Sequence, residues 1–96
     1  MVFSNMQKKA VSITIHGRVQ GVGFRYFVYN LAKEMGVEGS VRNRPDGTVY
    51  VEAQAPADLL ETFTYHCKQG PSHSHVRRAD VIPIPTQQDV SEFYIG

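Results

Sequence analysis

The residue types that could do chemistry lie in one glycine-rich turn, Gly17-Arg18-Val19-Gln20-Gly21-Val22-Gly23-Phe24-Arg25. Its three glycines allow positive φ angles and let a ligand approach the main chain closely. If a helix begins at Phe24, its first amide groups have no internal partner, and the helix dipole favours an anion there. Arg25 adds a planar cation whose donors match phosphate oxygens. The turn therefore predicts an oxyanion cradle for phosphate; the alternative is a tight connection with no ligand.

Several other phosphate chemistries do not fit this turn. A dinucleotide fingerprint would need a glycine at the position of Tyr26, and the Gly-Lys-Ser/Thr of a nucleotide P-loop does not occur. The position at which some phosphatases carry a cysteine nucleophile holds Val19. The single cysteine, Cys67, falls in a helical stretch far along the chain, where we expect a small core residue. Direct attack of water on phosphorus is therefore favoured over a covalent intermediate.

The elements that position the turn follow from hydrophobic periodicity. Val11–Ile15 alternates apolar and polar residues and predicts a strand with one buried face. Apolar residues at helical spacing predict a helix over Phe24–Met35, which Gly36 ends. The remaining expected elements are strands at Val37–Asn43 and Thr48–Ala53 joined by an Asp-Gly turn, a helix opened by Pro56 and Asp58 and ended by Gly70-Pro71, a strand at Val76–Ile84 and a short strand at Ser91–Ile95.

This order predicts an α+β fold of the ferredoxin-like, or split βαβ, type. The βαββαβ sequence gives one antiparallel sheet of four strands plus a short fifth, with two helices on one face. We expect one domain over residues 11–96, preceded by a loosely ordered lead-in over residues 1–10.

Strand parity links Asn43 to the cradle. Val41 and Asn43 share a face, and Val41 is expected to point under the helices, so Asn43 points to the same side at the end of its strand. An amide there can donate and accept at once, which suits the orientation of a water molecule. The equally weighted alternative is a turn residue that caps its own backbone.

Composition bounds the partners. Among 96 residues, ten basic and nine acidic side chains give a formal charge of +1, which provides no global field for nucleic acid or a membrane. One cysteine cannot form an internal disulfide, and no apolar run has the length of a signal peptide or membrane span. We expect a cytoplasmic protein that is a monomer by default.

Two segments resemble signatures of the acylphosphatase family. Gly17–Arg25 matches the first signature along its whole length, and Gly39–Val49 resembles the second. Length, element order and spacing agree with the family from about residue 11 to residue 95. The family usually has an aromatic residue at the position of Ser40 and a glycine at that of Ala55. Neither departure falls in the cradle.

The resemblance implies hydrolysis of the carboxyl–phosphate bond of small acyl phosphates, without a metal or cofactor. It further implies that Arg25 and main-chain amides bind the phosphoryl group and that Asn43 positions the attacking water. These amides belong to Val19, Gln20, Gly21, Val22, Gly23 and Phe24. The motif has no evident general acid, and a mixed anhydride needs none because it leaves as a carboxylate. The phosphate oxygen of the substrate itself is the hypothetical acceptor of the water proton.

Two other functions compete with this hypothesis. RNA-recognition modules share the βαββαβ order, but the aromatic stretch Gly23–Tyr29 falls in a loop and helix, and the open sheet face offers one aromatic, Tyr50. A non-catalytic domain that binds phosphate or acyl phosphate is the third possibility, and the presence of both Arg25 and Asn43 argues against it.

The histidines are expected to stay outside the chemistry. His16 has the opposite parity to Ile13 and Ile15, so it should face away from the cradle. His73 and His75 lack the further ligands that a metal site needs, so no metal is expected.

Overall fold

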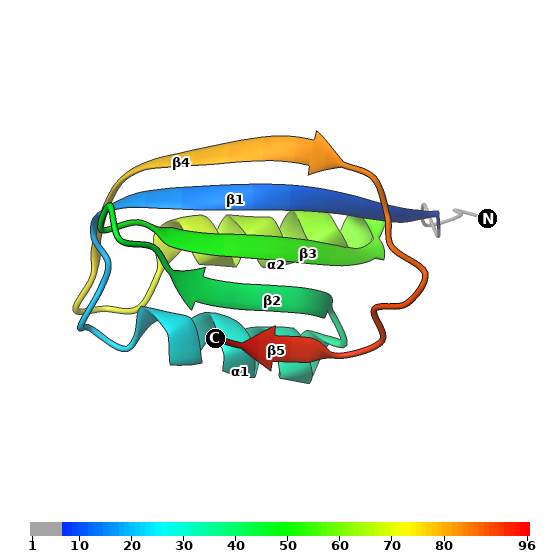
Figure 1. The fold of residues 1–96 in the computed structure, drawn as a ribbon, viewed down its shortest axis with the longest axis horizontal. Helices are drawn as coiled ribbons and strands as arrows, with labels where there is room; N and C mark the ends of the chain where they lie inside the picture. The colour runs from blue at the N-terminus through cyan, green and yellow to red at the C-terminus, as the bar shows by residue number, and fades with distance from the viewer. Residues whose placement is uncertain (1–6) are drawn as a thin grey trace.

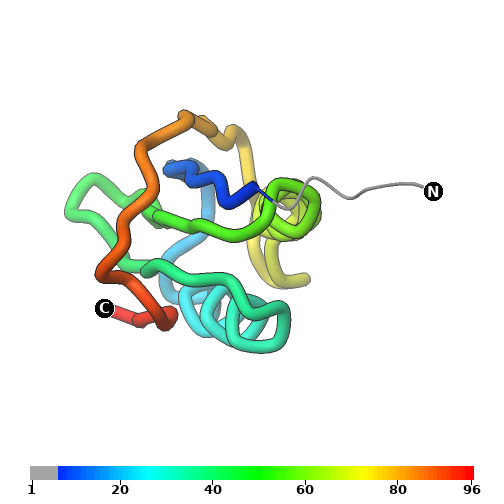
Figure 2. The backbone as a smooth tube through the Cα atoms, turned by 90° about the vertical axis from the view of Figure 1, so that its right-hand side faces the viewer, coloured from blue at the N-terminus to red at the C-terminus, as the bar shows by residue number. Residues whose placement is uncertain are grey.

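A computed structural model, which describes residues 7–96, contains a single five-stranded sheet in the order β4-β1-β3-β2-β5. Both helices lie on one face of this sheet (Figures 1 and 2). The elements are β1 (Lys8–Arg18), α1 (Phe24–Met35), β2 (Glu38–Asn43), β3 (Val49–Pro56), α2 (Ala57–Gln69), β4 (His75–Ile84) and β5 (Phe93–Ile95). The α+β class and the βαββαβ order are confirmed. Four strands pair antiparallel as expected, and the short β5 adds to β2 in parallel.

The beginning of β1 differs from the expectation. The strand starts at Lys8, because Lys8, Lys9 and Ala10 pair with the end of β3 from Gln54 to Pro56. Residues 8–10 therefore belong to the sheet and not to a loosely ordered lead-in, since ladder hydrogen bonds fix them. Residues 1–6 of that expected lead-in lie outside the described residues.

The core lies between the sheet and the two helices. Side chains on the helix-facing side of the strands alternate with side chains on the open face, as the period of two requires. On the sheet side the fully buried residues are Ile13, Ile15, Val41, Val49 and Val51, and on the helix side they include Phe24, Val28, Ala32, Phe63 and Cys67. Cys67 is thus a core residue, as predicted, and its burial raises the pKa of its thiol.

The open face of the sheet carries more aromatic surface than the sequence indicated. Because Phe93 packs toward the helices, its neighbour Tyr94 faces the other way, opposite Ser40 of β2, and is 54% exposed. The expectation of Tyr50 as the one aromatic there was therefore wrong, because the sequence does not set the register of a three-residue strand. Tyr50 itself is covered by the guanidinium of Arg44, 3.7 Å from its ring centroid.

Among residues 7–96, no helix is long and apolar enough to cross a membrane.

Candidate active site

The cradle is the loop that leaves β1 at Arg18 and enters α1 at Phe24. Its two ends are fixed because Val19 and Phe24 are each only 1% exposed. Between them, Gly21 and Gly23 take φ angles of 74° and 80°, a region that side chains disfavour. Gly23 is the N-cap of α1 and has no side chain to satisfy the first amides, and the first turn contains no acidic residue. First-turn amides without a side-chain cap and the positive end of the helix dipole favour an anion, so the loop is a candidate anion site.

One cavity of about 290 Å³ brings the cradle and Asn43 together. Its lining residues are Val19, Gly21, Gly23, Phe24, Arg25, Tyr26 and Asn43. The placement of Asn43 beside the cradle, expected from strand parity, is therefore what the fold produces. Of the loop residues named for phosphate binding, Gln20 and Val22 are not among those that line this cavity.

Arg25 lines the cavity, and within residues 7–96 no carboxylate side chain compensates its charge. Its Nη1 donates to the main-chain oxygen of Gly96, and its guanidinium lies 5.8 Å from the centroid of the Tyr26 ring. Within residues 7–96, the ion pairs join other residues, so no carboxylate side chain neutralises Arg25. Tyr26, 59% exposed, is a lining residue that the sequence analysis did not single out, although it follows Arg25 in the first turn.

The turn after Asn43 is held by other side chains. Asp46 Oδ1 accepts hydrogen bonds from Thr48 N at 3.0 Å and Thr48 Oγ1 at 2.7 Å, so Asp46 caps this turn. Gln20 Nε2 donates to the main-chain oxygens of Arg44 and Thr48. In the described part of the chain the Asn43 side chain has no hydrogen bond of its own, so it does not cap the backbone, and its amide is available to a ligand or water.

His16 lies on the opposite face of the sheet from the cradle, as its parity predicted. Its Nε2 lies 3.1 Å from Asp80 Oδ2 and 3.1 Å from Arg78 Nη2, both on β4. This cluster lies on the open face and contributes no group to the cavity. Among residues 7–96, His, Cys, Asp and Glu side chains form no group of three or more that could hold a metal ion.

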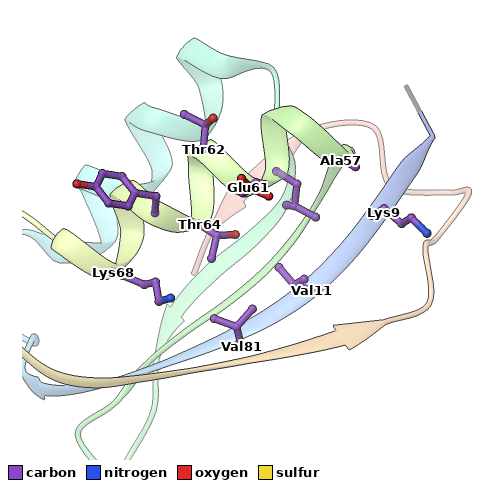
Figure 3. A pocket seen from close by; sticks show the side chains of 10 residues that line it. Lys9, Val11, Ala57, Glu61, Thr62, Thr64, Lys68 and Val81 are labelled. Carbon is purple, nitrogen blue, oxygen red and sulfur yellow. The ribbon is translucent and has the colours of Figure 1, made fainter. Parts of the chain in front are cut away.

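A larger cavity of about 650 Å³ lies along α2, over the helix-side surface of β1 and β4 (Figure 3). Val11, Leu60 and Val81 contribute apolar surface to it, while Lys9 and Lys68 contribute cations. It contains none of the glycines, amides or polar groups of the cradle. The smaller cavity is therefore the candidate active site, because anion chemistry depends on donors and charge more than on volume.

The fold and this site together define a small α+β protein with a main-chain anion cradle beside an arginine and an asparagine. A model of the acylphosphatase family matches residues 11–95. The chain is 42% identical over 84 residues to the acylphosphatase of Enterococcus faecalis, covering 86% of this chain and 92% of that protein. It is 44% identical over 89 residues to the acylphosphatase of Ligilactobacillus salivarius, covering 90% of this chain and 99% of that protein.

The crystal structure of the Bacillus subtilis acylphosphatase superposes with a TM-score of 0.87 at 36% identity, covering 92% of this chain and 98% of that one. The chain therefore belongs to the acylphosphatase family. It is accordingly a hydrolase that acts on acyl phosphates.

Proposed function

We propose that the cavity hydrolyses small acyl phosphates to a carboxylate and inorganic phosphate by direct, in-line attack of water on phosphorus. Arg25 and the amides from Val19 to Phe24 hold the phosphoryl oxygens, and Asn43 orients the water. The observation that carries the proposal is that Arg25, the glycines Gly21 and Gly23, and Asn43 line the same cavity. Phosphoryl transfer of this kind depends mainly on positioning and on the stabilisation of charge, which these groups supply.

The chemistry of the lining residues favours water as the nucleophile. They include no cysteine, serine, histidine or carboxylate that could attack phosphorus, and none of these usual ligands for a resident metal. Attack breaks the bond between phosphorus and the bridging oxygen, which leaves with its electron pair as a carboxylate. The water proton passes to a phosphate oxygen of the substrate. A leaving group this stable needs no general acid, so the proposed substrates are mixed anhydrides, not ordinary phosphate esters.

The proposal includes activity without a metal or cofactor, in a cytoplasmic monomer that has no nucleic-acid partner. The near-balanced charge of the chain supports the last point, because ten basic and nine acidic side chains provide no global field for a polyanion.

The test is hydrolysis of benzoyl phosphate in the presence of a metal chelator. Arg25→Ala and Asn43→Ala should each lower kcat/KM by about 100- to 1000-fold, the usual cost of one preorganised donor. The controls are Arg77→Ala and Asn30→Ala, which remove the same side-chain types from exposed positions outside the cavity. A folded wild-type protein without turnover would leave anion or RNA binding as the alternatives.

Turnover in ¹⁸O-labelled water shows whether water attacks phosphorus or the carbonyl carbon, and so which bond to the bridging oxygen breaks. Attack on phosphorus puts the label into inorganic phosphate, whereas attack on the carbonyl carbon puts it into benzoate. Label in benzoate would contradict the proposed mechanism even if the protein is active.

A further inference from the structure

We propose that the Gln20 side chain is a positioning residue that acts through Asn43, fixing the turn that follows it against the phosphate cradle. This inference rests on the proposed function, because it assigns Gln20 to the placement of the attacking water. Only the main-chain amide of Gln20 belongs to the proposed phosphate site.

Both protons of the Gln20 amide are used in one clamp. Nε2 donates to Arg44 O at 2.8 Å and to Thr48 O at 2.9 Å, and the side chain is half-buried. Each of these two carbonyl oxygens also accepts a main-chain hydrogen bond within the turn. Arg44 N donates to Thr48 O at 2.9 Å, and Gly47 N donates to Arg44 O at 3.1 Å. Each carbonyl therefore accepts one bond from the turn and a second from the cradle, which matches its two lone pairs.

The clamp joins the two halves of the candidate site. Gln20 follows Val19, which is buried and lines the cavity, and Arg44 is the residue directly after Asn43. Asn43 itself is exposed, and no hydrogen bond of its own side chain within residues 7–96 holds it. The position of the Asn43 amide relative to the cradle is therefore set by the backbone on either side of it. On one side β2 pairs with β3, and on the other the turn is held by Gln20.

A clamp of this kind has a specific kinetic consequence. Loss of the two bonds detaches the turn from the cradle, although Asp46 and the main-chain bonds of the turn still close it, and so misplaces Asn43. Arg25 and the loop amides still bind phosphate. Water orientation contributes to the chemical step, and a displacement of about 1 Å can cost on the order of 100-fold in rate. We expect Gln20→Met, which keeps the length of the side chain and removes both donors, to lower kcat by about 10- to 100-fold. KM and the inhibition constant of inorganic phosphate should change by no more than about twofold.

Gln54→Met is the matched control. Gln54 also uses Nε2 twice, donating to Glu38 Oε1 at 3.0 Å and Gln87 O at 2.8 Å, and it is only 4% exposed. It lies outside the cavity, so its loss should destabilise the fold while kcat is unchanged. Thermal melts of both variants establish that they are folded at the assay temperature. An equal loss of kcat in the two variants would show that Gln20 has only a general structural role.

A second variant gives a pH readout. Gln20→Glu places a carboxylate against two carbonyl oxygens, an arrangement that repels when the group is charged and restores one donor when it is protonated. Its kcat relative to wild type should therefore be lowest near neutral pH and rise as the pH falls below about 6. A relative kcat that is independent of pH would contradict the clamp, since lost packing does not titrate.

A double-mutant cycle separates this inference from the proposed function. If Gln20 acts through Asn43, Gln20→Met combined with Asn43→Ala should be no slower than Asn43→Ala alone, and additive losses would overturn the inference. Normal kcat in Gln20→Met, together with a large loss in Asn43→Ala, would refute the role of Gln20 and leave the proposed function intact. Normal kcat in Asn43→Ala would instead refute the proposed function.

Discussion

Asp46 does not line the cavity of the candidate site, but its side chain caps the turn that follows Asn43. Its two hydrogen bonds from Thr48 favour the ionised carboxylate, and they lower the pKa of Asp46 although the group is exposed. A carboxylate whose pKa is lower in the folded than in the unfolded state stabilises the fold above its unfolded pKa. This contribution is lost as the pH falls through the folded pKa.

We therefore predict a pH-dependent effect of Asp46→Ala on stability. The difference in Tm between wild type and Asp46→Ala should be largest near neutral pH and shrink as the pH falls below about 4, the ordinary pKa of the group. Thermal melts over this range measure it. Asp89→Ala is the control, since the Asp89 carboxylate lies in an exposed loop and makes no ion pair within residues 7–96. A difference in Tm that stays constant as the pH falls would mean that the ionised Asp46 carboxylate does not cap the turn.

Residues whose positions depend on the nearby sequence could be predicted, whereas contacts between residues far apart in the sequence could not. The positions of Arg25 and Asn43 beside one cavity followed from the strand-to-helix turn and from strand parity, which are local properties of the sequence. The clamp from Gln20 and the contact from Arg25 to Gly96 join residues 24 to 28 and 71 positions apart, respectively. No periodic pattern reports which carbonyl meets which side chain across such a distance, so these supports became visible only in the structure.

The path of β1 into the cradle includes an irregularity in its pairing with β4. The register of β1 against β4 shifts between His16 and Gly17, where Gly17 takes a φ of 131°. A Cβ at this position would lie 2.1 Å from His75 O and 2.8 Å from Arg77 N, both main-chain atoms of β4. Since His16 pairs with Arg78 and Gly17 pairs with Val76, the register skips Arg77, and the extra residue of this bulge lies in β4. The glycine at the start of the cradle is visible in the sequence. The bulge could not be predicted from it, because the pairing register depends on two strands that are far apart in the sequence.

Gly17→Ala should therefore be much more damaging than an alanine at another glycine with positive φ. We predict a loss of at least about 2 kcal/mol of unfolding free energy, from strain and from the clash with the β4 backbone. Gly47→Ala is the matched comparison, because Gly47 has a φ of 91° and nothing lies within 4 Å of a Cβ there. Urea unfolding of the two variants measures the difference. Equal losses would show that β4 yields without cost and that the bulge does not require glycine.

At the scale of the whole molecule, the short β5 closes the core. Phe93 is only 4% exposed, and its ring centroid lies 6.1 Å from that of Phe63 on α2 and 6.5 Å from that of Tyr29 on α1. One aromatic side chain thus joins both helices to the edge of the sheet. The same strand ends next to Gly96, whose main-chain oxygen receives the hydrogen bond from Arg25. Packing of the core and placement of the Arg25 guanidinium are therefore linked through the three residues of β5.

Phe93→Ala tests whether this edge is an integral part of the domain. Removal of a buried phenylalanine ring costs about 3–5 kcal/mol, a large share of the roughly 5–15 kcal/mol that stabilises a domain. We expect the urea midpoint to fall with the slope m unchanged, since one cooperative unit still unfolds. Tyr94→Ala, one residue further along and facing solvent, should change stability by no more than about 0.5 kcal/mol. If both variants lose the same small amount, β5 is an appendage; if only Phe93→Ala lowers m, β5 detaches before the rest of the sheet unfolds.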